Sequence, residues 1–430
     1  MRSTELCNKC INMLYFPHRL VEKAKMMIGR WSLKLPYRWR RYLLLVLHIF
    51  DPYLCIVFGW LHNLSKMIAC MTYEGALSEP EDFPKTEEPV WLLGKEYSTQ
   101  TDLAALRSDV QSRLWMTYRR NFAQIGDSNF TSDKGWGCML RCGQMVLAEA
   151  LIRRHLGRDW TWESSTSDET YLRILSLFED HKCATFSLHI MSQLGVDEGK
   201  PIGEWYGPNT VAQVIRKLVI FDEWNNFSVN VALDNIVIMD EIKCSCQVEG
   251  ERGWRPLLLF IPLRLGLSEM NPVYYSGIKK CFKMPQSLGL IGGKPNHASY
   301  FVGFVGDEVV YLDPHTTQEA GSVAKKATET EVETDKSYHC MYAQRMPFEH
   351  LDPSLALCFY CGTEKEYDDL CNRMRQELID AEKTPLFELV PTRPDYMKDD
   401  SSLEGASGRC MELEDHHLES EDDEEFEVLQ

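Results

Sequence analysis

The stretch "TSDKGWGCMLRCGQMVLAEALIRRHLG", residues 131–157, places a cysteine where a loop of small residues meets a long apolar run. The run that follows Cys138 contains few polar residues, among them Arg141, Gln144 and Glu149. A helix that is apolar nearly all round lies buried in a protein core. The stretch therefore predicts a buried helix that begins at Cys138 and ends before Gly157, with Cys142 one turn behind the first cysteine.

Two roles suit a cysteine at this junction. A helix N-terminus stabilises a thiolate through its unpaired N–H groups and partial positive charge, which would make Cys138 a nucleophile. Gly135 and Gly137 would leave the front of the thiol open. The alternative is an apolar core cysteine, the common fate of a free thiol. The motif leaves both roles open for Cys138, whereas Cys142 is more typical of a packed core thiol than of a redox group.

A nucleophilic cysteine needs a base and a group that orients the base. The segment "NHASYFVGFVGDEVVYLDPHTTQ", residues 296–318, offers two candidate histidines, His297 and His315. Asp313 and His315 are two residues apart, and residues with this spacing on a strand face the same side. His297 with Asp313 has an equally suitable order, so spacing leaves the choice of base open.

Helical patterns occur mainly before residue 222, and one more occurs near the end of the globular region. We expect helices at 207–221, capped by Asn209 or Thr210, and at 364–379. A further helix is expected at 107–122, with one side formed by Val110, Leu114, Trp115 and Tyr118.

Strand patterns follow, at 255–265, 297–305, 308–315 and 354–362, the middle two forming a hairpin around residues 306–307. The segment 319–337 is expected to be a mobile polar insertion between strands. Helices that lead and strands that follow indicate an α+β fold with a mainly antiparallel sheet.

Composition narrows the function. A net charge of −18 over 430 residues argues against a nucleic-acid-binding surface, which needs clustered Lys and Arg. The 15 cysteines are scattered over a long chain, and no secretory cleavage signature is present, so we expect reduced thiols in a cytoplasmic protein. The closely spaced cysteine pairs are 7/10, 244/246 and 358/361. Each pair lies too far from the other pairs in the sequence to suggest a four-ligand zinc site. We expect neither a metal nor a cofactor.

The chain divides into three regions at about residues 70 and 391. Residues 1–70 are basic and apolar, and "YLLLVLHIFDPYLCIVFGWL" at 42–61 approaches the about 20 residues that cross a bilayer. Asp51 and Pro52 interrupt this run at its centre, where an aspartate is costly. We favour one of two interpretations of residues 1–70. They form a hairpin at a membrane surface, or they are an extension absent from the mature protein, which would then start at Met71.

Residues 71–391 have a globular pattern, and 392–430 form an acidic tail that is too poor in apolar residues to fold alone. Near the end of this tail, Phe426 and Leu429 flank two residues behind an acidic run. An aromatic and an aliphatic residue with this spacing can add to a partner's sheet as an edge strand. A chance pair of apolar residues would give the same pattern.

Four motifs, "GWGCMLRCGQM", "WYGPNT", "GGKPNHA" and "LDPHTTQ", occur in this order, and the chain from Met71 to Gln430 resembles the autophagin family of autophagy-related cysteine endopeptidases, closest to its B-type members. The resemblance implies a papain-like fold with a small extra subdomain. It implies cleavage of ubiquitin-like autophagy modifiers, the GABARAP and light-chain group, after a C-terminal glycine. It also implies release of these modifiers from phosphatidylethanolamine, which brings the enzyme transiently to a membrane surface.

Residue by residue, the resemblance implies that Cys138 is the nucleophile, His315 the base and Asp313 its orienter. Tyr118, in "WMTYRRNF", matches the tyrosine whose hydroxyl helps to build the oxyanion hole beside the Cys138 N–H. The resemblance thereby implies that His297 lies on a mobile loop and is not the base.

The family's substrate contacts match other motifs. The segments that cover the cleft in the family match Trp205, Pro295 and its neighbour Asn296 in this chain. The family's tail motif that binds the modifiers matches Phe426 and Leu429. Two departures stand out. A second such motif near the N-terminus is disrupted, because Ala76 follows Tyr73 where an aliphatic anchor is expected, and residues 1–70 have no counterpart in the family pattern.

Two other functions compete with this one. One is a catalytically dead protease body that displays a modifier-binding tail, and the other is a thiol protease for ubiquitin itself. The intact set of Cys138, Asp313, His315 and Tyr118 favours an active enzyme over the adaptor, because a drifted pseudoenzyme usually loses at least one such residue.

Overall fold

The computed structural model describes residues 82–248, 253–323 and 328–395. The interpretations of residues 1–70, of Tyr73 and Ala76, and of Phe426 and Leu429 therefore lie outside the described residues. Within the described ranges, none of the helices combines the length and the apolar character that crossing a bilayer requires.

A nine-stranded sheet forms the centre of the described chain, in the order β11-β9-β8-β7-β12-β6-β4. β1 pairs with the end of β8 and β2 pairs with β1, so β8 is shared between β7 and β1 along its length. The neighbours are antiparallel except for β4 and β6, which run parallel. The strands are β1 Val90–Leu92, β2 Lys95–Tyr97, β4 Ser228–Val231, β6 Leu257–Arg264, β7 Ser287–Gly292, β8 Ser299–Val305, β9 Glu308–Leu312, β11 Gln344–Pro347 and β12 Ser354–Cys361.

Two short parallel pairs complete the described strands, β3 (Tyr118–Arg120) with β10 (Thr317–Glu319) and β5 (Ile236–Ile238) with β13 (Glu388–Val390). The α-helices are α4 Leu103–Ser112, α5 Cys138–His155, α6 Glu169–Ser176, α7 Leu188–Val196, α8 Pro208–Leu218, α9 Met239–Cys246, α10 Tyr275–Lys283, α11 Glu329–Lys336 and α12 Glu364–Arg373. Four tighter or wider helical segments are Val219–Phe221, Pro272–Tyr274, Phe348–His350 and Met374–Ile379.

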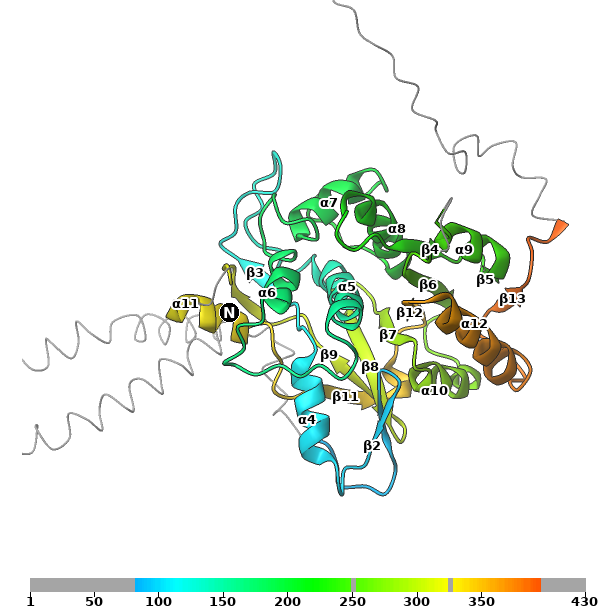
Figure 1. Cartoon of the computed structure of the whole chain (residues 1–430). Helices are drawn as coiled ribbons and strands as arrows, with labels where there is room; N and C mark the ends of the chain where they lie inside the picture. The colour runs from blue at the N-terminus through cyan, green and yellow to red at the C-terminus, as the bar shows by residue number, and fades with distance from the viewer. Residues whose placement is uncertain (1–81, 249–252, 324–327, 396–430) are drawn as a thin grey trace, which may run out of the picture.

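Helices cover both faces of the large sheet. α5 runs through the middle of the molecule with α6, α7 and α8 beside it, while α10 and α12 lie on the other side (Figure 1). The side chains of β12 alternate between the two cores: Cys358 packs with the α5 side and Cys361 with the α10 and α12 side. This alternation separates the two thiols of the CxxC pair, so they cannot hold one metal ion together.

The expected helix at the cysteine junction is present. α5 begins at Cys138, every residue from Cys138 to Ile152 is buried, and the chain turns at Gly157 with a φ of +89°. The predicted hairpin forms from β8 and β9, and strands occupy both other predicted positions as β6 and β12. The α+β class, with a mainly antiparallel sheet and a buried helix that begins at Cys138, is confirmed.

The helix predicted over 107–122 is wrong in its second half. α4 ends at Ser112, and Tyr118 lies on strand β3. In place of helical bonds, the Trp115 N–H donates to the Tyr338 carbonyl at 2.8 Å and the Tyr118 N–H to the Pro314 carbonyl at 2.9 Å. Tertiary partners thus override a helical pattern, because they satisfy the backbone equally well.

Two smaller expectations also need correction. The N-cap of α8 is Gly207 and not Asn209 or Thr210, because Pro208 has the fixed φ that suits a first helical position. The polar insertion 319–337 contains α11, which starts with a capping box and buries Asp335 completely.

Candidate active site

The start of α5 positions the Cys138 thiol. Gly137 is the N-cap, and a side chain at this position would collide with the Asp133 carboxylate. As the first residue of the helix, Cys138 has a backbone N–H that no intrahelical carbonyl uses. Cys138 is fully buried, so its sulfur meets this unpaired N–H end in a site shielded from water.

His315 and Asp313 reach the same site from the segment between β9 and β10. The Asp313 carboxylate accepts a bond from the His315 backbone N–H at 3.0 Å and also pairs with its Nδ1. Trp115 fixes this segment, because its Nε1–H donates to the Asp313 carbonyl at 2.7 Å. With Nδ1 occupied by Asp313, the imidazole leaves its buried Nε2 for the Cys138 thiol.

The thiol and the imidazole shift each other's ionisation. Burial raises the pKa of Cys138, but His315, through its hydrogen bond and its charge, and the Tyr118 hydroxyl lower this pKa by more, so it lies below its usual value. Burial lowers the pKa of His315, but bonds with Asp313 and Cys138 raise it to about 10. These opposite shifts favour a thiolate beside an imidazolium at neutral pH.

Tyr118 stands beside this pair. Its ring meets the His315 ring edge to face, with centroids 5.5 Å apart and an angle of 84° between the planes. Burial and the neighbouring Cys138 sulfur raise the pKa of the Tyr118 hydroxyl, so the hydroxyl stays protonated and remains a donor. The site therefore contains two donors next to the sulfur, this hydroxyl and the Cys138 N–H.

The other cysteine and histidine of the two motifs lie apart from this chemistry. Cys142 is fully buried, and burial together with the Cys138 charge raises its pKa well above the usual value, so it stays a thiol. His297 is exposed on the loop between β7 and β8. Of the two candidate histidines, His315 is the one that pairs with Asp313 in the described structure.

The residues expected to cover the cleft lie on two loops. Trp205 precedes α8, is half-buried, packs against the α5 core and has a buried Nε1. Pro295 and Asn296 are exposed on the β7–β8 loop, where Asn296 has a left-handed φ of +64°. This loop ends at the buried Ala298, whose backbone borders the Cys138 sulfur closely enough to lower its pKa.

Three residues that the sequence did not single out as functional also support the site. Trp115 holds Asp313, and the fully buried pair Asp133 and Arg141 lies beneath the start of α5. Arg141 was recognisable as a charged residue in an otherwise apolar buried helix. A buried charge needs a buried partner, and this rule was the available signal.

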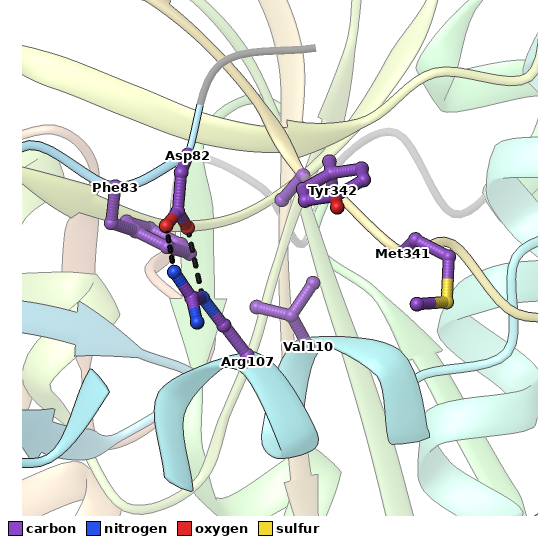
Figure 2. Close-up of a pocket in the computed structure, with 7 residues that line it drawn as sticks. Asp82, Phe83, Arg107, Val110, Met341 and Tyr342 are labelled. Carbon is purple, nitrogen blue, oxygen red and sulfur yellow. Dashed lines mark hydrogen bonds and ion pairs between the residues drawn. The ribbon is translucent and has the colours of Figure 1, made fainter. Parts of the chain in front are cut away.

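Two surface pockets of the described chain are not lined by the residues of the candidate site. The larger, about 570 Å³, lies beside Trp162 and His339. Figure 2 shows a small surface pocket where Asp82 pairs with Arg107 beside Val110, with Met341 and Tyr342 opposite. Its volume is about 10 Å³, the space of a single water molecule. The described residues contain no cluster of three or more His, Cys, Asp or Glu side chains that could hold a metal ion. All ten cysteines in the described ranges are unpaired.

Comparison with known proteins places this geometry in context. A family model described as the peptidase C54 catalytic domain matches residues 103–373. Cysteine protease ATG4B of Xenopus laevis is 46% identical over 385 residues, which cover 84% of this chain and 99% of that protein. Cysteine protease ATG4A of Mus musculus is 47% identical over 383 residues, covering 81% of this chain and 94% of that protein. A-type and B-type relatives thus match to the same degree, and identity does not favour the B-type.

Proposed function

This chain belongs to the peptidase C54 family of cysteine proteases, and from that membership we propose that it cleaves ubiquitin-like autophagy modifiers of the GABARAP and light-chain group after a C-terminal glycine. The proposal covers both the modifier precursor and its phosphatidylethanolamine conjugate. It places the enzyme in the cytoplasm, with transient visits to membrane surfaces. The observation that carries the proposal is the convergence of Cys138, His315, Asp313 and Tyr118 on one buried site.

In this mechanism the Cys138 thiolate attacks the glycine carbonyl carbon and forms a C–S bond. The carbonyl oxygen takes up negative charge, which the Cys138 N–H and the Tyr118 hydroxyl stabilise as an oxyanion hole. The tetrahedral intermediate then collapses, the C–N bond breaks, and the His315 imidazolium gives its Nε2 proton to the leaving nitrogen. Asp313 holds the ring so that Nε2 faces the reacting atoms.

The second half of the cycle hydrolyses the thioester. Neutral His315 takes a proton from water, the hydroxide attacks the glycine carbonyl, and the C–S bond breaks to restore the thiolate and imidazolium. The same steps apply to both substrates, because glycine is joined through an amide nitrogen in each. In the precursor this nitrogen belongs to the next residue, and in the conjugate it belongs to ethanolamine. One site can therefore serve maturation and delipidation without a metal or cofactor.

Two loops and the tail would select the substrate. Trp205 on one side and Pro295 with Asn296 on the other are proposed to cover a narrow groove that accepts glycine and excludes larger side chains. Phe426 and Leu429 are proposed to hold the modifier at a second point. Such a contact raises the effective concentration of the substrate without changing the chemistry.

The test is cleavage of a modifier precursor that carries a C-terminal extension, with product masses measured for wild type and Cys138→Ala. We expect a single cut after the glycine and no cut by the variant. Equal cleavage by both proteins would refute the assignment of Cys138. A ubiquitin fusion treated in parallel separates the ubiquitin-protease alternative. Modifier binding by a wild-type chain that does not cut would instead support the adaptor alternative.

A further inference from the structure

A buried carboxylate outside the reacting groups connects the two segments that supply the oxyanion donors. The Asp133 Oδ1 accepts the Arg119 backbone N–H at 2.6 Å, and the Asp133 carbonyl accepts the Gly137 N–H at 2.9 Å. Arg119 directly follows Tyr118, and Gly137 directly precedes Cys138. One side chain and one carbonyl of the same residue therefore bind β3 on one side and the start of α5 on the other.

Arg141 holds this carboxylate in place. Its Nε lies 2.8 Å from Asp133 Oδ2 and its Nη2 lies 3.1 Å from Oδ1, and neither side chain is exposed. A bidentate pair of this kind fixes the plane of the carboxylate as well as its position. Asp180 adds a second negative charge on the far side, with its Oδ1 2.9 Å from Arg141 Nη1.

We infer that the Asp133–Arg141 pair is a positioning element of the active site that sets the distance between the Tyr118 hydroxyl and the Cys138 N–H. The inference rests on the proposed function, in which these two donors form the oxyanion hole. Donors must lie about 2.7–3.1 Å from the developing oxyanion, and a shift of about 1 Å can cost about 100-fold in rate. A rigid ionic link between the two donor segments meets this requirement.

The position of the Asp133–Arg141 pair also indicates that the reactivity of the Cys138 thiolate should not depend on it. The strongest influences on the pKa of Cys138 are burial, His315, Tyr118 and the Ala298 backbone, and the Asp133 charge is not among them. Loss of the Asp133 charge should therefore leave the thiolate reactive while the oxyanion hole loosens. A residue that only stabilises the fold would not separate these two properties.

The test compares Asp133→Asn with the matched control Asp180→Asn in the full chain. Each variant leaves Arg141 with one carboxylate, but of these two carboxylates only that of Asp133 accepts the Arg119 backbone N–H. We expect Asp133→Asn to lower kcat on a modifier precursor by roughly 10- to 100-fold, with KM nearly unchanged, because a displaced donor costs less than a removed one, which costs about 10²- to 10³-fold. The alkylation rate of Cys138 by iodoacetamide should stay within about twofold of wild type. Asp180→Asn should leave kcat near wild type.

A double-mutant cycle with Tyr118→Phe isolates the coupling. If Asp133 acts through the Tyr118 hydroxyl, Asp133→Asn should cost much less in the Tyr118→Phe background than in wild type. Additive losses, equal kcat losses in Asp133→Asn and Asp180→Asn, or a matching loss of alkylation would each overturn the inference. Should Asp133→Asn not fold, Arg141→Lys keeps the charge but cannot bridge both oxygens, and it should give the same separation of kcat from alkylation.

These measurements also separate the inference from the proposed function. If Tyr118→Phe alone keeps the wild-type kcat, the oxyanion role of Tyr118 is wrong, and the inference fails with it. If Tyr118→Phe lowers kcat and Asp133→Asn does not, the proposed mechanism stands and only the positioning role is refuted.

Discussion

Replacement of His315 by alanine should change the ionisation of the nucleophile as well as remove the proton donor. In the wild type, His315 is the main group that opposes the effect of burial on the Cys138 thiol. Without the imidazolium, burial dominates, and the pKa of Cys138 should rise to that of an ordinary thiol or above it. An ordinary thiol, with a pKa of about 8.5, is about 3% ionised at pH 7, so alkylation by iodoacetamide should slow by roughly 30-fold or more.

Cleavage should fall further than alkylation in the same variant. The imidazolium also donates the proton to the leaving nitrogen, a contribution typically of about 10²- to 10⁴-fold. In the wild type, thiolate forms as pH rises through the lowered pKa of Cys138, and the imidazolium is lost as pH rises through about 10. Cleavage should therefore decline on the basic side near pH 10, whereas alkylation should not decline there.

The assay follows the peptide that contains Cys138 by mass spectrometry over pH 5 to 10, because 15 cysteines make total thiol titration uninformative. His297→Ala is the matched control and should reproduce both wild-type profiles. An alkylation profile of His315→Ala that superimposes on wild type would refute the ion pair. A larger cleavage loss from His297→Ala than from His315→Ala would move the base to His297.

Three further variants test the rest of the site. Cys142→Ser should keep most of its turnover per folded molecule. It should lose about 1–3 kcal/mol of unfolding free energy, because a hydroxyl replaces a buried thiol. Loss of turnover as complete as in Cys138→Ser, in a folded protein, would contradict the core role of Cys142. Trp205→Ala should label at least as fast with a small thiol reagent but discriminate less between glycine and larger residues at the cut, and unchanged selectivity would leave Trp205 as a packing residue only. The double variant Phe426→Ala with Leu429→Ala should raise KM and leave kcat near normal, since only ground-state binding is lost. If a titration with a modifier that lacks its cleavable tail gives equal affinities for this variant and wild type, the enzyme's own tail has no part in the mechanism.

Local sequence patterns predicted the central elements of the fold. The helix from Cys138 and the hairpin of β8 and β9 each follow from a strong local pattern, an apolar run bounded by glycine in the first and alternation around a two-residue turn in the second. The segment after Ser112 could not be predicted in the same way. Its backbone bonds go to Tyr338 and Pro314, which are about 200 residues away in the chain, and no local pattern records such partners.

The candidate site, like the fold, could be predicted only in part from local sequence patterns. Motifs identified Cys138, His315 and Asp313, but spacing alone could not choose between His297 and His315. The choice depends on where the β7–β8 loop and the segment after β9 lie relative to α5, and this is a property of the assembled sheet. The structure places His315 against Asp313 and leaves His297 exposed.

The polar residues of α5 explain why one helix can serve both the core and the site. Arg141 pairs with Asp133 and Asp180 near the thiol, and Glu149 pairs with Arg113 at 2.7 Å and Arg153 at 2.8 Å, three turns away. Each buried charge is matched by a charge of opposite sign, and most of these partners come from other segments, so the helix can be buried along its whole length without an uncompensated ion. At the Cys138 end, Asp133 also accepts the Arg119 backbone N–H, and so it links the helix to the strand that carries Tyr118. The interactions that satisfy the buried helix are therefore also the interactions that give the reacting groups their geometry.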